Sequence, residues 1–215
     1  PKFIVGDISV TQFVQNQGDD LMTGGGFNPA TGEVVAELDT ANATPSALRK
    51  YNVAANYKSI MDPITPGGWQ VFWGPTVVED IHSHDASGFT GLVSGYEYVG
   101  TVDDGSGTVN VTLVVQVPDT FNPENPCLLA GPSSGSRGVY GAIGTAGDAA
   151  LKRGCAVAMT DKGTGDGVHL VGAGQVLDLQ GQLVAVSEAG KQSAFTAQLP
   201  EEYLNHVDPK IATTK

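Results

Sequence analysis

Two stretches in the middle of the chain are rich in β-branched and aromatic residues. They are residues 96–102 and 108–117, and an Asp-Asp-Gly-Ser-Gly sequence at 103–107 separates them. Two β-rich runs joined by an Asp/Gly turn predict an antiparallel hairpin. We expect the hairpin to end at Pro118, because proline has no backbone N–H to donate to a strand ladder.

Two short, continuously apolar runs come next, at residues 127–130 and 155–159. A run without alternation is typical of a strand buried on both faces. A Gly/Ser loop at 131–138 and a helical stretch from about 139 to 152 connect the two runs. This order predicts a βαβ unit with parallel strands and a right-handed crossover. A second Gly-rich loop follows at 160–167.

The first part of the chain has fewer regular patterns. We expect Thr44 or Ser46 to cap a helix, and residues 69–73 alternate as a short strand would. We therefore interpret residues 1–94 as an N-terminal extension with one helix and short strands. Residues 95–215 are interpreted as the first half of a sheet, with strands 1–4 and a following loop region.

The order of these elements predicts a fold class. An antiparallel hairpin followed by parallel βαβ winding is how α/β-hydrolase sheets begin. The predicted fold is α/β, as the N-terminal part of an α/β-hydrolase that is incomplete without a downstream segment. A domain ending at its fourth strand would expose apolar surface. We therefore expect the outer face at the last parallel strand (155–159) to be open, with a partner covering it.

Composition and charge narrow the classes of partner. The chain is 40% hydrophobic and 16% charged, which is typical of a globular protein rather than a disordered one. Its formal net charge is −12, and such a surface repels phosphate backbones and anionic lipids. No apolar run reaches the roughly 18 residues that a membrane span needs. We predict no nucleic acid and no membrane among its partners.

One loop carries a motif of hydrolase chemistry. Gly131-Pro132-Ser133-Ser134-Gly135 matches G-x-S-x-G between a strand and a helix, the context of a serine nucleophile, so Ser133 is one candidate. A Gly/Ser turn that only caps the helix is a second interpretation. The loop follows the first parallel strand, which is where oxyanion-hole loops lie in α/β-hydrolases. This position favours a third role, in which backbone N–H groups near Ser133, Ser134 and Gly135 stabilise a developing oxyanion.

The remaining polar candidates point to no metal and no cofactor. His82 and His84 share an acidic loop but have no third ligand at a recognised spacing. His169 follows the second Gly-rich loop and could face a cleft, and His206 lies near the end. The sequence identifies no partner carboxylate for either. Residues 103–107 lack the spacing of a calcium loop, and a hairpin turn explains them.

Longer segments make the chain recognisable. They are Val117-Pro118-Asp119, Asn125-Pro126-Cys127, and residues 133–147, 151–158 and 160–165. Together these segments closely resemble the D-3-hydroxybutyrate-oligomer hydrolase family. The resemblance covers most of the chain and is strongest over residues 108–167.

The resemblance implies a serine esterase that cleaves short 3-hydroxybutyrate oligomers to monomers, more distantly similar to tannases and feruloyl esterases. In the family, the nucleophile lies in a Ser-Asn-Gly-Gly-type sequence well downstream, in a polypeptide several times longer, and no Ser-Asn-Gly occurs here. We therefore expect the catalytic Ser, Asp and His on a companion C-terminal segment or chain. This chain would supply the oxyanion loop at Ser133, Ser134 and Gly135, and would be inactive alone.

Arg137 lies beside the proposed oxyanion loop in a very acidic chain. A cation there could receive the free carboxylate of a small hydroxyacid-ester substrate. The alternative is a structural arginine that bonds the ends of neighbouring loops.

The two cysteines open the two predicted parallel strands. Neighbouring strands lie about 4.8 Å apart, within the usual Cα separation of a disulfide, so we predict a Cys127–Cys155 bridge. The alternative is two buried free thiols. A bridge, and Pro1 rather than Met at the start, suit an exported protein. We expect a processed or truncated front and a secreted or periplasmic location.

Two further functions stay open. The chain could be a non-catalytic binding or structural module with an α/β-hydrolase-like start. It could also be an independent hydrolase that uses Ser133 with one of its four His residues. A co-purifying polypeptide with a Ser-Asn-Gly-Gly-type segment would speak against the first, and retained activity in Ser133→Ala against the second.

Overall fold

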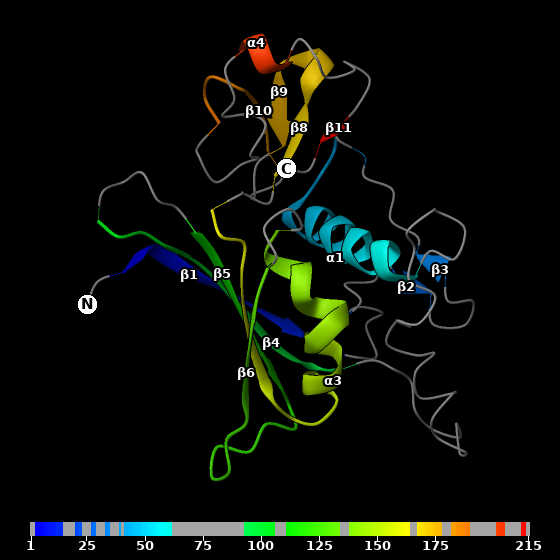
Figure 1. The fold of residues 1–215 in the computed structure, drawn as a ribbon, viewed down its shortest axis with the longest axis vertical. Helices are drawn as coiled ribbons and strands as arrows, with labels where there is room; N and C mark the ends of the chain where they lie inside the picture. Colours follow the sequence, from blue (N-terminus) through cyan, green and yellow to red (C-terminus); the bar gives the residue numbers. More distant parts are fainter. Residues whose placement is uncertain are drawn as a thin grey trace.

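A mixed sheet with helices on one side forms the centre of the computed structural model (Figure 1). The structure describes residues 3–14, 20–22, 27–28, 33–34, 39, 41–61, 93–105, 111–133, 138–163, 167–177, 182–189, 201–204 and 212–213. The five strands of the sheet are β1 (Ile4–Phe13), β4 (Gly95–Val102), β5 (Val111–Pro118), β6 (Leu128–Pro132) and β7 (Ala156–Thr160). They are arranged in the order β1-β4-β5-β7-β6.

The strand pairings confirm both the predicted hairpin and the predicted parallel pair. β4 and β5 are antiparallel, with Tyr98 opposite Val115. β6 and β7 are parallel, with Leu128 opposite Ala156. β1 joins the same sheet through an antiparallel pairing with β4. The division of the chain at residues 94 and 95 stays a prediction, but this one strand of the first region belongs to the sheet of the second.

The edge of the sheet differs from the expectation. We expected the opening at the last parallel strand of the chain, which is β7. β7 instead lies inside the sheet, between β5 and β6, so the parallel end of the described sheet is β6. The reason is that the helical connection after β6 places β7 on the side of β6 that faces β5, so β7 fills the position between β5 and β6.

The connection between β6 and β7 is helical, as predicted for residues 139–152, but it is not one α-helix. It consists of a 3-10 turn η2 (Val139–Ala142), a π-helical turn η3 (Ile143–Gly147) and a short α3 (Asp148–Leu151). Glycines within the segment lower its helix propensity. Gly131 of β6 lets the segment approach closely, since a Cβ there would lie 2.9 Å from the Cβ of Ala142.

The long helix α1 (Pro45–Met61) begins where the sequence predicted a cap. The Thr44 hydroxyl accepts the backbone N–H of Ala47 at 3.1 Å, and Pro45 follows at the first helical position. α1 and the η2–α3 segment lie on the same side of the sheet (Figure 1). Between sheet and helices lies a core that includes Val114, Val157, Met159, Ile143 and Leu151.

A second, smaller sheet was not anticipated, because its strands are too short to show a periodicity. Its strands β8 (Val168–Leu170), β9 (Gln175–Leu177), β10 (Leu183–Ala185) and β11 (Ala212–Thr213) are arranged β10-β9-β8-β11. Also present are η4 (Val171–Ala173), α4 (Glu201–Leu204) and a ribbon of β2 (Phe27–Asn28) with β3 (Glu33–Val34). Leu48 of α1 packs in one cluster with Val168 and Leu177 of the small sheet. The strand expected at residues 69–73 lies outside the described residues.

The predicted disulfide is present. Cys127 and Cys155 are bonded, and their Cα atoms are 4.6 Å apart. The bridge joins the residues directly before β6 and β7, where the parallel register brings the starts of the two strands together. The bridge closes a loop with a sequence separation of 28 residues. On the chain-entropy account, closing such a loop stabilises a fold by about 3–4 kcal/mol.

Candidate functional site

The carboxyl ends of β6 and β7 lie side by side, and each is followed by a glycine-rich loop. Ser133, directly after β6, is 1% exposed, and its backbone N–H donates to the carbonyl of Thr160 at 2.9 Å. This N–H continues the parallel ladder. The oxyanion hypothesis therefore depends on the N–H groups of Ser134 and Gly135. These two residues and Arg137 lie outside the described residues, so their roles stay predictions.

Asp161 anchors the second of these loops. Its carboxylate Oδ1 accepts the backbone N–H of Thr112 at 2.9 Å and that of Gly163 at 2.8 Å. Lys162, between Asp161 and Gly163 in the chain, adopts a left-handed conformation with φ of 65°. The side chain of Asp161 is fully buried, so the start of the loop is fixed against the beginning of β5. An Asp two residues before a Gly is a turn signal that the sequence offered and our interpretation did not use.

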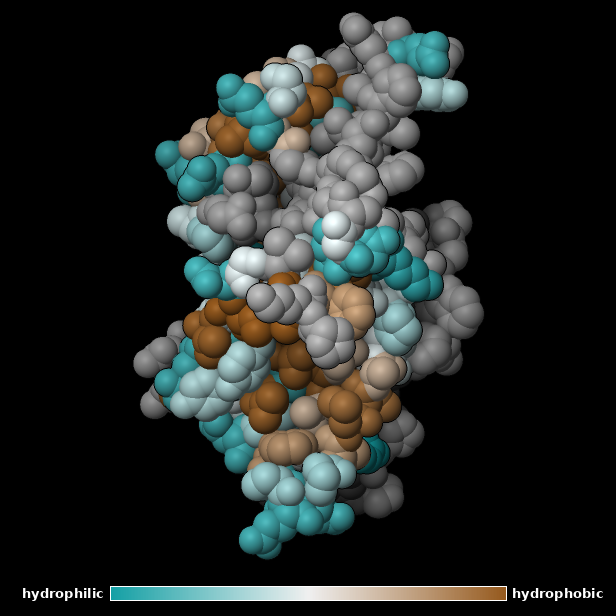
Figure 2. Space-filling model, turned by 90° about the vertical axis from the view of Figure 1, so that its left-hand side faces the viewer, coloured by the Kyte–Doolittle hydropathy of each residue, from teal (hydrophilic) through white to brown (hydrophobic). Residues whose placement is uncertain are grey.

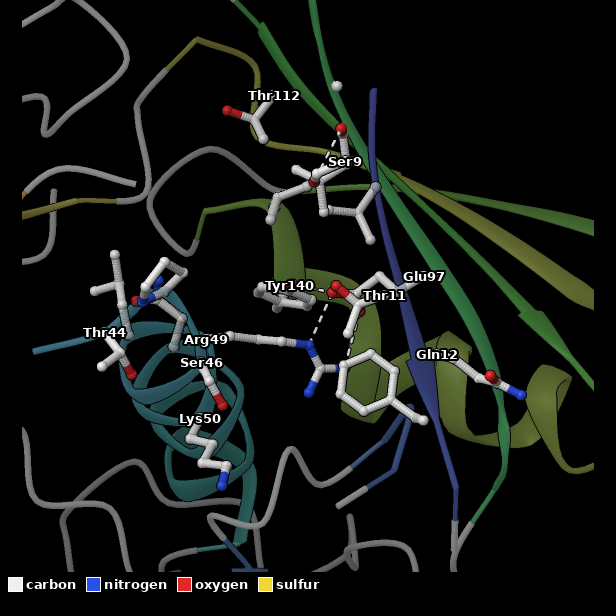
Figure 3. Close-up of a pocket in the computed structure, with 18 of the residues that line it drawn as sticks. Ser9, Thr11, Gln12, Thr44, Ser46, Arg49, Lys50, Glu97, Thr112 and Tyr140 are labelled. Atoms are coloured by element: carbon white, nitrogen blue, oxygen red, sulfur yellow. Dashed lines mark hydrogen bonds and ion pairs between the residues drawn. The ribbon is translucent and has the colours of Figure 1, made fainter. Parts of the chain in front are cut away.

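A buried ion pair lies on the helix-covered face of the sheet. Arg49 of α1 donates to Glu97 of β4 at two points, Nε to Oε1 and Nη2 to Oε2, both at 2.8 Å. Glu97 accepts two further hydrogen bonds at 2.8 Å, from the Tyr140 hydroxyl and from the Gln116 amide. Figure 3 shows Arg49 reaching from α1 toward Glu97 and Tyr140.

The surroundings of Arg49 hold its guanidinium in one position. It stacks over the ring of Phe13, 4.1 Å from the centroid, and faces the ring of Tyr140 at 5.6 Å. It also donates to the carbonyl of Leu21 at 3.2 Å. Such cation–π contacts gain strength when the cation is desolvated. Four separate parts of the chain therefore meet at one charged group.

The pKa of Glu97 reflects this environment. Burial by itself would raise it, but the charge of Arg49 and the hydrogen bonds from Arg49, Gln116 and Tyr140 outweigh the burial. They hold the pKa of Glu97 below its ordinary value. Glu97 is therefore a buried carboxylate in its charged form, which suits a structural anchor and not a proton donor.

The ion pair is connected to the candidate loop through Tyr140. Tyr140 lies in the first turn after the loop that begins at Ser133, and its hydroxyl is bonded to Glu97. No local pattern in the sequence predicts this connection, because Tyr140 is 43 positions and Arg49 is 48 positions from Glu97. One signal was available: Glu97 stands at an alternate position of a strand, on the face that had to be buried.

A cavity of about 770 Å³ opens beside the ion pair, between the first half of α1 and strands β1, β4 and β5. Hydroxyl groups gather on its wall, from Ser9, Thr11, Thr44, Ser46 and Thr112. Thr112 is 2% exposed, and its hydroxyl has no hydrogen-bond partner among the described residues. Glu97 neutralises the charge of Arg49. The part of the cavity wall near the ion pair therefore presents mainly hydroxyl and aromatic groups to a bound molecule.

The histidines give no second site in the described part of the chain. His169 lies in β8, is 1% exposed, and burial lowers its pKa. The sequence left open that His169 could face a cleft, and the structure shows its side chain buried. His82, His84 and His206 lie outside the described residues. Among the residues that are described, no three His, Cys, Asp or Glu side chains are grouped to hold a metal ion. No helix in the described ranges combines the length and apolarity of a membrane span.

Comparison with known proteins places the chain in a hydrolase family. The model of the 3HB-oligomer hydrolase (3HBOH) family matches residues 1–213. The chain belongs to the 3HB-oligomer hydrolase family. This confirms the resemblance seen in the segments around the two glycine-rich loops.

Relatives agree with the family match. A D-(-)-3-hydroxybutyrate oligomer hydrolase of Paraburkholderia xenovorans (strain LB400) is 45% identical over 203 residues, 93% of this chain and 28% of the relative. The enzyme of the same name from Burkholderia thailandensis is 44% identical over 199 residues, 92% of this chain and 28% of the relative. The chain thus spans little more than a quarter of the length of these relatives. No solved structure matches it.

Proposed function

We propose that the chain is part of a serine esterase that hydrolyses short 3-hydroxybutyrate oligomers to monomers. The observation that carries the proposal is the family match over residues 1–213, together with relatives named as oligomer hydrolases. Because the chain corresponds to 28% of those relatives, we assign it one side of the active site and not the whole.

The architecture supports an α/β-hydrolase start. The antiparallel pair β4–β5 is followed by the parallel unit β6–helix–β7, which is the beginning expected of that fold. The loop after β6 then stands where oxyanion donors lie. In this proposal the N–H groups of Ser134 and Gly135 point at the reacting ester carbonyl.

The chemical division of labour follows from this placement. A serine on a companion segment attacks the ester carbonyl, a histidine takes the serine proton, and the carbonyl oxygen becomes an oxyanion. The loop of this chain stabilises that oxyanion. Collapse of the intermediate breaks the ester C–O bond, and the leaving alkoxide takes the proton from the histidine and departs as the hydroxyl end of the next monomer. Water, deprotonated by the same histidine, then attacks the acyl-serine and releases the free hydroxyacid and the serine. Arg137 would receive the terminal carboxylate of the oligomer. The reaction uses no cofactor.

Burial of Ser133 supports a nucleophile elsewhere. At 1% exposure, its side chain has no open path to a substrate carbonyl in the described structure. The G-x-S-x-G match at this position is therefore incidental in our proposal.

The disulfide supports a secreted or periplasmic location for the enzyme. Disulfides persist in oxidising compartments and are rare in the reducing cytosol. The Cys127–Cys155 bridge joins the residues directly before the parallel strands β6 and β7, and we propose that it forms on export.

The test is turnover of 3-hydroxybutyrate dimer and trimer by this chain with and without the rest of the family polypeptide. We expect activity only with both. In the active complex, Ser134→Pro deletes an N–H and should lower kcat about 100- to 1,000-fold, the usual cost of one oxyanion donor. Ser133→Ala should change kcat little. Loss of all turnover in Ser133→Ala, with the fold intact by circular dichroism, would make Ser133 the nucleophile and refute the proposal.

A further inference from the structure

No described helix covers the side of the main sheet opposite α1 and α3 (Figure 1). The register places Val10, Tyr98 and Val115 in one row across β1, β4 and β5. A second row on the same face contains Tyr96 and Val117. Alternate residues of a strand share a face, so these rows belong to one surface.

Exposure marks this surface as unusual. Large apolar side chains are exposed along it: Ile4 at 49%, Ile8 at 47%, Val10 at 56%, Tyr96 at 38%, Tyr98 at 37% and Leu128 at 68%. Figure 2, which views the molecule from the side away from the helices, shows hydrophobic residues gathered across its lower half. We name these six residues the outer-face patch. Contiguous apolar surface of this kind marks an interaction site.

The edge strand β6 adds a second open feature that adjoins the patch. The carbonyl of Cys127 accepts from Ala156, and the N–H of Ser133 donates to Thr160, so odd-numbered positions of β6 bond to β7. In a parallel strand the backbone groups of alternate residues point to opposite sides. The N–H and C=O groups of Leu128 and Ala130 therefore point away from the sheet, where the described strands offer no neighbour.

We propose that the outer-face patch and the outer edge of β6 bind the remainder of the family polypeptide, which adds a strand parallel to β6 and lays helices over Val10, Tyr96 and Tyr98. This inference rests on the proposed function, since that remainder is the companion segment. The length of the relatives supplies the occupant: the chain covers 28% of them.

The nature of the edge favours this occupant over a second copy of the chain. The sheet ends in a parallel pair, and parallel sheets carry helices on both faces, because their crossover connections run over them. Leu128 to Ala130 form part of an apolar run that suits an interior strand and not an edge. A two-fold dimer would pair the two β6 edges antiparallel and would leave most of the outer face uncovered.

The experiment uses the complete chain with an affinity tag, co-expressed with the remainder of its polypeptide as a separate segment. The readout is the amount of that segment retained on the tagged chain. Tyr98→Lys and Leu128→Lys each place a charge in the proposed contact and should lower retention at least about tenfold. Tyr203→Lys is the matched control: Tyr203 is 59% exposed on α4, outside the patch, and should retain the segment fully.

A second measurement needs no variant. Hydrogen exchange at the Leu128 and Ala130 amides of the unmodified chain should slow on binding, while the Leu129 amide, which faces β7, should be protected before and after. Both results together support the proposal. Retention unaffected by Tyr98→Lys and Leu128→Lys, or Leu128 and Ala130 amides that exchange equally in both states, would overturn it.

Self-association supplies a further outcome. If the chain alone formed a dimer that Tyr98→Lys dissolves, and the remainder did not compete with it, the occupant would be a second copy and the proposal would fall. The proposed function is tested separately, by turnover of 3-hydroxybutyrate trimer in the unmodified mixture. An active complex insensitive to the face variants refutes only the docking surface, whereas an inactive complex with the predicted contacts refutes only the function.

Discussion

Arg49 and Glu97, 48 positions apart, form a two-point ion pair at 2.8 Å beneath the helices that cover the main sheet. Their side chains are 10% and 2% exposed. Each is also bonded to other parts of the fold, so the pair fastens α1, β4 and the segment after the candidate loop to one another.

Arg49→Met should destabilise the chain by about 3–5 kcal/mol, because it leaves the Glu97 carboxylate buried without its counter-charge. Urea unfolding followed by circular dichroism measures the loss. Arg153→Met is the matched control, since Arg153 is exposed and donates to a backbone carbonyl at the surface. We expect about 0.5 kcal/mol or less there. A loss as small for Arg49→Met would show that the ion pair does not hold the fold.

Stability should fall in acid through Glu97. The pKa of Glu97 is below its ordinary value of 4.5 in the fold, so the unfolded chain binds a proton at higher pH than the folded chain does. The stabilisation is complete above pH 4.5 and is lost as the pH falls through the lowered pKa. The free energy of unfolding should be measured from pH 7 to 3 for the wild-type chain and for Glu97→Gln. The wild-type value should exceed the variant's value at neutral pH, and the difference should shrink below pH 4.5. An advantage that stayed constant down to pH 3 would contradict this.

Tyr140→Phe should act on catalysis without removing any group that meets the substrate. The substitution deletes the hydrogen bond to Glu97 that positions the first turn after the candidate loop. In the complete enzyme, kcat should fall about 10- to 100-fold, with KM nearly unchanged, as expected when catalytic donors are slightly misplaced. Tyr203→Phe on the exposed α4 is the control and should leave both constants unchanged. Equal changes in KM and kcat for Tyr140→Phe would argue for a role in substrate binding.

Reduction of the Cys127–Cys155 bridge should cost about 3–4 kcal/mol, since the bridge closes a loop with a sequence separation of 28 residues. Urea unfolding with and without a reductant measures the change. The double variant Cys127→Ser, Cys155→Ser should match the reduced protein and show no response to the reductant. Two reactive thiols in the denatured, unreduced protein would refute the bridge.

The sequence by itself determined the elements whose signals are local. The β-rich runs before Pro118 predicted the hairpin, and the two cysteine-led apolar runs predicted the parallel pair and its disulfide. The cap predicted at Thr44 or Ser46 located the start of α1, and the structure has Thr44 in that role. These signals depend on neighbours in the chain, through turn chemistry, capping and the alternation that burial on one face imposes.

Only the tertiary structure decided which elements meet. Periodicity says that a strand is buried but not beside which strand, so the interior place of β7 and the edge place of β6 were not predictable from the runs themselves. The same holds for the meeting of Arg49, Glu97 and Tyr140, which lie on three elements that the fold brings together. A charged side chain carries no mark of its partner in the sequence, because burial and Coulomb attraction act through space and not along the chain.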